Sequence, residues 1–324
     1  MYYDTAGRLQ NDVTVAPDGT NTTLKYDVAS GDMISKMVKE PDGDLFTTNY
    51  TDGIRTGYTY VGHLGDKQTT TYDKAGVMLT DYVLNTDGSA TNKTYVGGEL
   101  MKQNIKNADG TMDNWAYNVT GKTYVTEHQS TDASGKITAI DRFHADGSYD
   151  YKEQRFADGS KDISTYDAKG TLLYNSEIEA DGSRVVHAHK QDGTGQVWSD
   201  HMSASGTILS RDISHTDGRH DLYAYANGQT LDGGAGNDTF YFRTTSDGKM
   251  LYEGGKDTVF NFNNDASGPD YIDIDSNWAS NFDDLNMSQQ GNDVLITFND
   301  QNSILIKQST VSALQQHHDY FVFS

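Results

Sequence analysis

The chain has 324 residues, no cysteine, and 47 acidic against 25 basic side chains, which gives a formal net charge of −22. This charge argues against a nucleic-acid ligand, because phosphates would be repelled, and it favours divalent cations as counter-ions. The lack of cysteine excludes a disulfide framework, and no run of about 18 apolar residues predicts a membrane span.

The composition predicts a fold with little core. Leu, Ile, Val and Phe make up 59 of 324 residues, or 18%. With a high net charge, a share below about 20% is typical of disordered chains. The 21 tyrosines and many threonines, however, favour strands. We therefore expect a thin all-β fold that depends on metal binding or on repeat stacking.

From Tyr3 to about Leu222 the sequence repeats itself. One mark is Tyr-Asp followed by glycine, as in Tyr72-Asp73 with Gly76. The second mark is Asp-Gly, which begins at Asp18, Asp42, Asp87, Asp109, Asp146, Asp158, Asp181, Asp192 and Asp217. Asp-Gly between alternating segments predicts hairpin turns in which both central residues have positive φ. Residues 1–222 are therefore expected to form an elongated antiparallel array of β-hairpins, each contacting its neighbours.

This repeat pattern is similar to the YD repeats of RHS-type surface and toxin proteins. The resemblance implies β-repeat geometry. It does not imply the toxin-encapsulating role of that family, because the glycine-proline-rich core motif that closes the family's repeats is missing and the spacing around Asp52 and Asp146 is irregular.

A different pattern begins after the hairpin rhythm stops, between Tyr223 and Gln229, and it predicts a second domain over residues 223–324. Residues 233–241 read Gly-Gly-Ala-Gly-Asn-Asp-Thr-Phe-Tyr and fit the calcium-binding nonapeptide G-G-x-G-x-D-x-U-x. The glycines let carbonyl oxygens converge. Asp238 adds a hard carboxylate oxygen, which Ca²⁺ prefers, and Phe240 is expected to point into a β-roll.

A partial copy of the motif follows at Gly255-Lys256-Asp257-Thr258-Val259, whereas Gln229 replaces the carboxylate in the preceding turn. Asp257 lies 19 residues after Asp238, and turns at one edge of such a roll recur about every 18 residues. One hypothesis is that both carboxylates face one ion; the other is that Asp257 caps a strand turn. The candidate calcium ligands are Gly233, Ala235, Asp238, Gly255 and Asp257.

Residues 231–324 resemble the C-terminal region of RTX (repeat-in-toxin) proteins, which are secreted calcium-binding proteins exported by type I systems. The resemblance implies a short calcium-binding parallel β-roll and a small β-rich cap with one or two short helices. We expect a helical turn at 282–285, a hairpin about 299–302 and a short helix N-capped by Ser309. The family also implies an export signal in the uncleaved C-terminus, here Asp319 followed by Tyr320 to Phe323. The missing N-terminal signal sequence agrees with this, and an ordinary edge strand is the alternative.

No catalytic residues emerge from the sequence. His187 and His189 share a strand face but have no third ligand at a recognisable spacing, and no H-E-x-x-H motif is present. Carboxylates that a glycoside hydrolase would need are plentiful, but abundant acids are usually solvated. The candidates are Asp141, Glu153, Glu177 and Glu179. There is no G-x-S-x-G nucleophile motif, P-loop or cysteine.

Aromatic residues are the other functional lead, because they recur on the repeat faces and can stack on sugar rings or on another protein. The candidates are Tyr95, Trp115, Tyr117, Tyr166 and Trp198. A cross-strand ladder that holds the sheet together is the alternative. With the RTX resemblance, these features lead us to expect a secreted, extracellular binding protein for adhesion, matrix or polysaccharide contact. Its partners would be calcium ions, a polysaccharide or cell-surface component, and a type I transporter. A carbohydrate-active hydrolase or lyase, or the non-catalytic C-terminal part of one, is the alternative.

Overall fold

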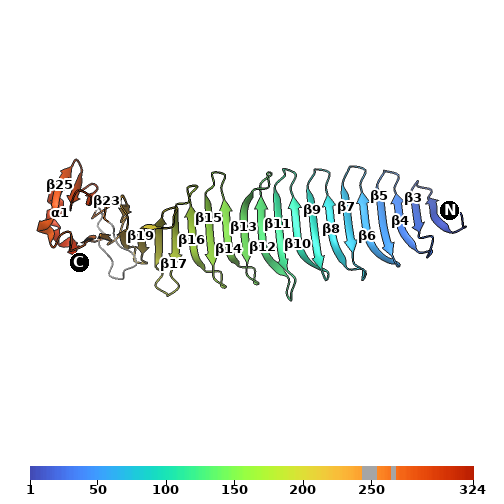
Figure 1. The fold of residues 1–324 in the computed structure, drawn as a ribbon, viewed down its shortest axis with the longest axis horizontal. Coiled ribbons are helices and arrows are strands. Elements are labelled where there is room, and N and C mark those ends of the chain that lie inside the picture. Colours follow the sequence, from blue (N-terminus) through green and yellow to red (C-terminus); the bar gives the residue numbers. More distant parts are fainter. Residues whose placement is uncertain (243–253, 264–267) are drawn as a thin grey trace. The chain divides into compact units, whose positions relative to one another are not determined.

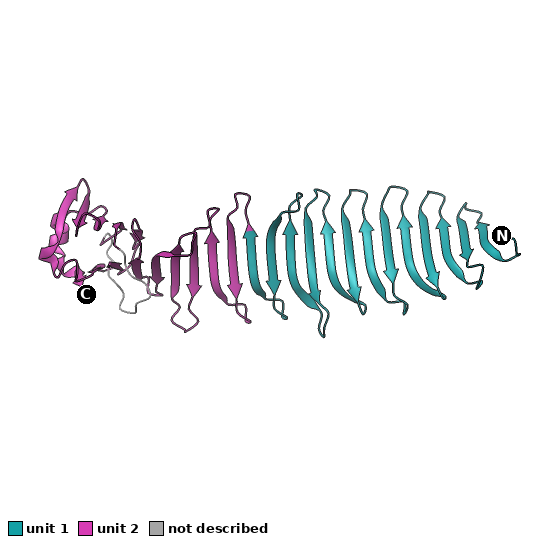
Figure 2. Ribbon diagram, in the orientation of Figure 1, with its two compact units in different colours: residues 1–154 teal, residues 155–324 magenta. Residues whose placement is uncertain are grey.

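The computed structural model describes residues 1–242, 254–263 and 268–324, and within these ranges the protein is all-β apart from a short α-helix and two 3₁₀ turns. The predicted fold class is confirmed. The chain divides into two compact units, residues 1–154 and 155–324 (Figure 2). In the described ranges no helix is long and apolar enough to cross a membrane.

The first unit is an antiparallel meander in which each strand pairs with the next one along the chain (Figure 1). Its strands are β1 (Tyr2–Tyr3), β2 (Leu9–Val15), β3 (Asn21–Tyr26), β4 (Met33–Lys39), β5 (Leu45–Thr51), β6 (Ile54–Val61), β7 (Lys67–Tyr72), β8 (Met78–Leu84), β9 (Ala90–Val96), β10 (Glu99–Lys106), β11 (Met112–Asn118), β12 (Tyr124–Thr131), β13 (Ile137–Phe143) and β14 (Tyr149–Arg155).

The nine Asp-Gly turns named in the sequence analysis differ from the prediction, because only the glycine of each pair has positive φ. In the turn at Asp18, the amide of Gly19 (φ 93°) donates to the Ala16 carbonyl at 3.0 Å, and the Ala16 amide donates to Thr20 at 2.9 Å. This is a type I turn followed by a left-handed glycine bulge. The Asp18 carboxylate accepts the Thr20 amide at 2.9 Å and so fixes the turn.

The Tyr-Asp mark produces the same turn with the aspartate two positions earlier. The Gly76 amide donates to the Asp73 carbonyl at 3.0 Å, and the Val77 amide donates to the Asp73 carboxylate at 2.9 Å. Both sequence marks are therefore one turn geometry. At Asp52-Gly53, alone among the Asp-Gly pairs that the structure describes, both residues have positive φ (51° and 75°), and this turn lies where the spacing is irregular.

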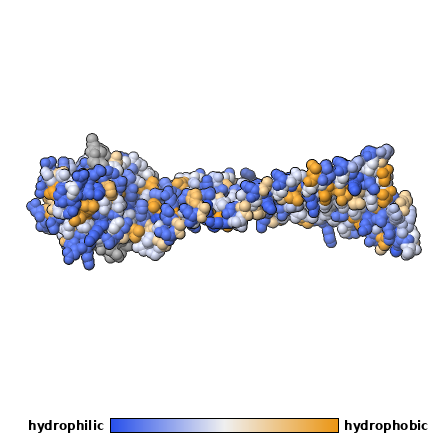
Figure 3. Space-filling view, turned by 90° about the horizontal axis from the view of Figure 1, so that it is seen from above, coloured by the Kyte–Doolittle hydropathy of each residue, from blue (hydrophilic) through white to orange (hydrophobic). Residues whose placement is uncertain are grey.

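The first unit has no apolar core. The buried apolar side chains among the described residues begin at Leu222, whereas the buried polar residues of the first unit include Thr70 and Glu153. On the face seen in Figure 3, hydrophobic and hydrophilic residues are interspersed. The predicted thin fold with little core is confirmed for this unit, which is held by ladder hydrogen bonds and by cross-strand side-chain pairs.

The second unit changes from antiparallel to parallel pairing. It begins with an antiparallel meander of β15 (Lys161–Tyr166), β16 (Leu172–Ile178), β17 (Arg184–His189), β18 (Val197–Met202), β19 (Ile208–Ser214) and β20 (His220–Ala224). A parallel ladder then joins β20 to β22 (Thr239–Phe242), β24 (Tyr271–Ile274) and β28 (Phe321–Phe323). A second parallel ladder joins β21 (Thr230–Asp232), β23 (Lys256–Phe260) and β27 (Ser303–Ile306).

The chain alternates between these two ladders, so the segment forms a β-roll with a packed interior. Phe240 and Ile272 from one ladder and Val259 and Ile304 from the other are 0% exposed. Phe240 points inward, as the sequence predicts. Antiparallel strands β25 (Asn286–Gln290) and β26 (Asp293–Thr297) extend the second ladder, and β26 and β27 form the predicted hairpin.

Three short helical elements complete the second unit. These are the 3₁₀ turns η1 (Phe282–Asp284) and η2 (His318–Tyr320) and the helix α1 (Val311–Gln316). The N-cap of α1 is Thr310, whose hydroxyl accepts the Ala313 amide at 3.1 Å. The predicted cap, Ser309, is therefore wrong by one residue, because threonine at 310 places its oxygen over the third helical amide.

Candidate metal centre

Asp238 lies at the end of the glycine turn, directly before β22, and its side chain is buried at 1% exposure. Its Oδ1 accepts the His220 amide of the neighbouring strand at 2.6 Å. Its Oδ2 is buried and has no hydrogen-bond partner. A buried carboxylate oxygen without a partner is costly, since desolvation is not compensated. In the described parts of the chain, this oxygen is the strongest candidate for a metal ligand.

The glycines of the turn are required by close packing around this carboxylate. A Cβ on Gly233 would lie 2.8 Å from Asp238 Oδ2. Gly236 has φ 152°, and a Cβ there would lie 2.5 Å from the Gly218 carbonyl oxygen of the preceding turn. The two turns therefore stack backbone against backbone, which only residues without a side chain permit.

Asp270 lies beside Asp238, although the sequence analysis did not select it. The pairing of Thr239 with Tyr271 brings the two carboxylates side by side, and Asp270 is 3% exposed. The Asp238 amide donates to Asp270 Oδ1 at 2.9 Å. A signal was present, because residues 268–272 read Gly-Pro-Asp-Tyr-Ile and repeat the half-motif G-x-D-x-U.

The electrostatics of the pair favour neutralisation. Burial raises the pKa of Asp238 to about 6; the hydrogen bond from the His220 amide acts in the opposite direction, and the nearby Asp270 carboxylate raises the pKa further. A divalent cation at this position would replace the proton as the counter-charge.

Asp257 lies in the other ladder, within β23, and is 1% exposed. Its Oδ1 accepts the Gln229 amide at 2.8 Å. The register of Thr230 against Thr258 confirms that Gln229 stands beside the aspartate position. The turn before Asp238 leads from the second ladder to the first, whereas the turn before Asp257 leads back, so the two turns lie at opposite edges of the roll. The hypothesis that both carboxylates face one ion is therefore not supported by the topology.

Gly255 supports close stacking at its own edge. It has φ 152°, and a Cβ there would lie 2.5 Å from the Cα of Asn227. The Lys256 amide donates to Asn227 Oδ1 at 2.8 Å. The Asn227 turn and the Gly255 turn thus repeat the backbone stacking seen at Gly236. At this edge of the roll, the side-chain oxygen of Asn227 accepts the amide of the neighbouring turn.

The residues at the Asp238 edge fit a hard dication. They offer the unpartnered Asp238 Oδ2, a second buried carboxylate from Asp270, and a glycine turn whose carbonyls include those of Gly233 and Ala235. Oxygen donors of this kind suit calcium. When bound, the ion would supply positive charge to two buried carboxylates.

A second acidic group was not anticipated from the sequence. Asp42, Asp44 and His63 place one ligand atom each within 4.8 Å of one another. Asp44 already accepts the His63 amide at 2.9 Å and the Tyr60 hydroxyl at 3.0 Å, and it contacts the His63 ring at 2.6 Å. These bonds hold the pKa of Asp44 below its usual range, chiefly through the His63 ring. We interpret the group as an ion pair.

The two histidines that share a strand face, His187 and His189, make other contacts. His187 Nδ1 lies 2.7 Å from the Ser199 hydroxyl, and His189 Nε2 lies 3.0 Å from the Asn175 side-chain oxygen. Both contacts run across strands, and neither involves a carboxylate.

Two of the aromatic candidates already have stacking partners. Trp115 stacks on His128 with ring centroids 3.8 Å apart and an interplanar angle of 16°. The Trp198 ring has two cations over it, the Lys190 ammonium at 3.6 Å and the Arg211 guanidinium at 4.6 Å from the ring centroid. Such contacts are typical of a ladder that holds a sheet together.

The tyrosine candidates lie near strand ends. Tyr95 is opposite Leu100, Tyr117 is opposite Val125, and Tyr166 is opposite Leu172. Burial raises the pKa of Tyr95 and Tyr117. Trp115 and Tyr117 are both on β11, whereas Tyr166 and Trp198 belong to the second unit.

No model of a known protein family and no curated protein matches the chain. Among solved structures, the chain is similar to a crystal structure of TcdB2-TccC3 without its hypervariable C-terminal region, with 12% identity and a TM-score of 0.22. The match covers 66% of this chain but 15% of that one. A porin-like protein from Bacteroides uniformis matches at 8% identity and a TM-score of 0.19, over 63% of this chain and 88% of that protein. Similarities this low establish neither a family nor a function.

Proposed function

We propose that the protein is a secreted, calcium-stabilised β-repeat protein that acts in extracellular binding. The observation that carries the calcium proposal is the buried Asp238 Oδ2 without a partner, next to a second buried carboxylate, Asp270. The complete nonapeptide supports the same ion, because its glycines pack directly against the carboxylate.

Calcium would act as a folding switch. In a low-calcium cytosol the acidic second unit would stay open for export, and millimolar calcium outside, the affinity range of extracellular modules, would close the roll. Residues 228–324 carry 14 acidic and 4 basic side chains, so neutralisation favours the compact state.

The test is calorimetric titration of calcium into the metal-free full chain. We expect binding heat and added order for the wild type, and an affinity weaker by about tenfold or more for Asp238→Asn and for Asp270→Asn. The matched control is Asp283→Asn, an exposed aspartate of η1, which should bind as the wild type does. Wild-type affinity in Asp238→Asn would overturn the site.

The export proposal rests on the C-terminal residues Asp319 and Tyr320 to Phe323. Residues 250–324 appended to a reporter should be exported by a type I transporter, and removal of the last five residues should abolish export. A reporter that stays in the cell with the complete segment would contradict this route.

The binding proposal rests on the aromatic side chains of the repeat strands, and its ligand class is a polysaccharide or a cell-surface component. A glycan array probed with the calcium-loaded chain tests it. Retention without turnover supports a binding protein, whereas release of reducing ends supports the alternative of a carbohydrate-active enzyme.

A further inference from the structure

Every second strand of the first unit, from β3 to β13, carries an aromatic residue at its last or second-last position. These strands run in the same direction, because each neighbouring pair in the meander is antiparallel. The aromatic residues therefore lie at the same ends of their strands. We call them the aromatic column: Tyr26, Tyr50, Tyr72, Tyr95, Tyr117 and Phe143.

The pairing register places the whole aromatic column on one face of the sheet. Directly opposed residues of neighbouring strands share a face, and each column residue follows a member of one continuous opposed row by two positions, which keeps it on the face of that row. The bulges at this end of the strands insert their extra residue in the even-numbered strands, so the alternation continues in the odd-numbered ones. The row members that precede the column are Leu24, Thr48, Thr70, Lys93, Trp115 and Asp141.

The side chains of the aromatic column are partly exposed. Tyr72 has the Arg55 guanidinium 4.4 Å from its ring centroid, and Phe143 has an aromatic neighbour. The other four members have no hydrogen bond to the hydroxyl and no aromatic or cationic ring contact in the described part of the chain. Most of the column thus presents both a ring and a hydroxyl that the fold does not engage.

The strand partners of the column continue it as an apolar strip across the strands. Tyr26 is opposite Met33, Tyr72 is opposite Met78, and the partners of Tyr95 and Tyr117 are a leucine and a valine. All of these partners are partly exposed as well. A ligand that follows the strip crosses the strands that lie side by side in Figure 1, rather than running along one of them.

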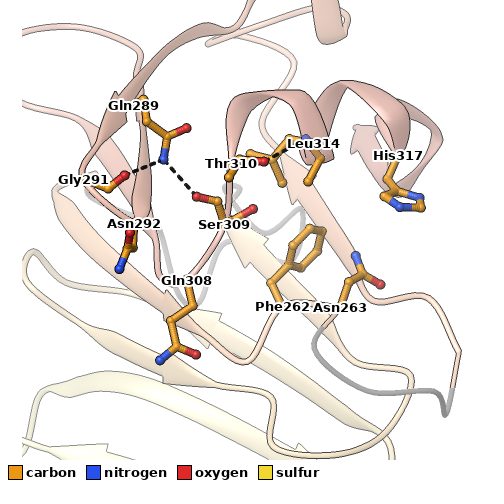
Figure 4. Close-up of a pocket in the computed structure, with 11 residues that line it drawn as sticks. Phe262, Asn263, Gln289, Gly291, Asn292, Gln308, Ser309, Thr310, Leu314 and His317 are labelled. Atoms are coloured by element: carbon orange, nitrogen blue, oxygen red, sulfur yellow. Dashed lines mark hydrogen bonds between the residues drawn. The ribbon is translucent and has the colours of Figure 1, made fainter.

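The pocket beside α1 in the second unit differs from this strip (Figure 4). Its apolar residues Phe262 and Leu314 are core side chains, at 8% and 2% exposure. Its Gln289 side chain already donates to the carbonyls of Gly291 and Ser309 at 3.0 Å each. The pocket therefore presents neither an open ring face nor an unused amide of Gln289, whereas the aromatic column presents open rings.

Spacing and charge select the occupant of the strip. Neighbouring strands lie about 4.7–4.9 Å apart, so successive members of the aromatic column recur about every 9.4–9.8 Å. Two consecutive rings of an extended β-linked hexose chain span a closely similar length, so every second sugar meets an aromatic side chain on which it can stack. The net charge of −22 repels both an anionic polymer and a second copy of this chain.

We propose that the aromatic column binds an uncharged, extended β-linked glycan that runs across the strands of the first unit. The proposal rests on the proposed binding function and deepens it, because it fixes the ligand class, the path of the ligand and the residues that meet it. Its residues include three tyrosines and a phenylalanine that the sequence analysis did not select: Tyr26, Tyr50, Tyr72 and Phe143.

The test is calorimetry on the full chain in excess calcium. The probes are β-1,4-linked glucose and N-acetylglucosamine oligosaccharides of two, four and six units, with an α-1,4-linked glucose hexamer as the bent arm. We expect at least one β-linked series to bind more tightly as its length increases and the α-linked hexamer to bind more weakly. Tyr50→Ala and Tyr95→Ala should each weaken binding of the β-linked hexamer by roughly threefold to tenfold.

The matched control is Tyr82→Ala. Tyr82 is also partly exposed on a strand of the first unit, but it follows the row member Asp81 by one position and so lies on the opposite face. Its affinity should equal that of the wild type. If Tyr95→Ala fails to fold, Tyr95→Leu carries the test, because it removes the ring and keeps an apolar side chain opposite Leu100.

The proposal is overturned if neither β-linked hexamer binds, if the α-linked hexamer binds equally well, or if Tyr82→Ala weakens binding as much as Tyr95→Ala. A dimer in sedimentation that Tyr95→Ala dissociates would assign the aromatic column to a second copy of the chain, and would also overturn it. The glycan array separates these failures from failure of the proposed binding function. If the wild type and the column variants retain another glycan there equally well, the column site alone is wrong.

Discussion

Asp238 has one carboxylate oxygen satisfied by a neighbouring strand and the other buried without a partner. The first oxygen sets the register of β20 against β22, so the residue has a structural task even without metal. The second oxygen makes the metal-free state less stable than a neutral side chain would. The stability of the metal-free fold and the proposed ion binding therefore place opposite demands on this one residue.

Replacing Asp238 by Asn should separate these demands. The amide keeps an oxygen for the His220 amide and removes the buried charge. The free energy of unfolding of the metal-free variant should therefore rise by on the order of 1–3 kcal/mol, and its unfolding midpoint should move to a higher denaturant concentration. Adding calcium should then give no further stabilisation. Guanidinium unfolding with and without chelator measures both effects, and a metal-free variant less stable than the wild type would contradict the argument.

The raised pKa of Asp238 predicts a pH dependence in chelator. Its folded value of about 6 exceeds the ordinary value of 3.8, so protonation stabilises the folded state fully below pH 3.8, and this contribution is lost as the pH rises through 6. The amount by which the guanidinium unfolding midpoint of Asp238→Asn exceeds that of the wild type should therefore increase from pH 4 to pH 7. A difference that stays constant over this range would show that Asp238 does not titrate in it.

Successive turns of the roll stack on one another, and their close backbone approach requires glycine at the contact. Gly236→Ala would place a Cβ 2.5 Å from the Gly218 carbonyl, and we expect a loss on the order of 2 kcal/mol or more. Gly234→Ala is the matched control, because Gly234 has φ 70° but nothing within 4 Å of its Cβ position; it should cost about 1 kcal/mol. Equal losses in the two variants, measured by chemical unfolding, would rule out turn stacking as the cause.

Strands and turns were largely predictable from the sequence, but turn type and long-range pairing were not. The pair Asp18-Gly19 matches a two-residue hairpin locally, yet the extra residues before it convert the turn to type I with a glycine bulge. Asp270 has the same half-motif as Asp257, but its distance of 32 residues from Asp238 hides the pairing. Sequence spacing predicts which residues of a β-roll lie side by side only when successive turns of the roll contain the same number of residues.

At the scale of the whole molecule, the two units differ in what stabilises them. Every fully buried apolar side chain in the described chain belongs to the second unit, as do Asp238 and Asp257. The first unit relies on nearest-neighbour strand pairs, and repeat arrays of this kind gain stability from each interface in turn. Calcium should therefore act on the two units unequally.

Amide hydrogen exchange in chelator tests this expectation. If calcium binds as proposed, residues 225–242 and 268–324 should exchange rapidly without it and become protected on its addition, because the ion would bind only the folded roll. Strands β3 to β13 should keep the same protection in both conditions. Protection of the second unit that does not change with calcium would mean that the roll is stable without the ion.

A sheet without an apolar interior also has a thermal consequence. The positive heat-capacity change of unfolding comes from newly exposed apolar surface, so the first unit should contribute less of it per residue than the second. Its stability curve should be correspondingly shallow, with resistance to cold as well as to moderate heat. Differential scanning calorimetry of the full chain should resolve a broad, low-curvature transition for the hairpin array beside a sharper one for the roll.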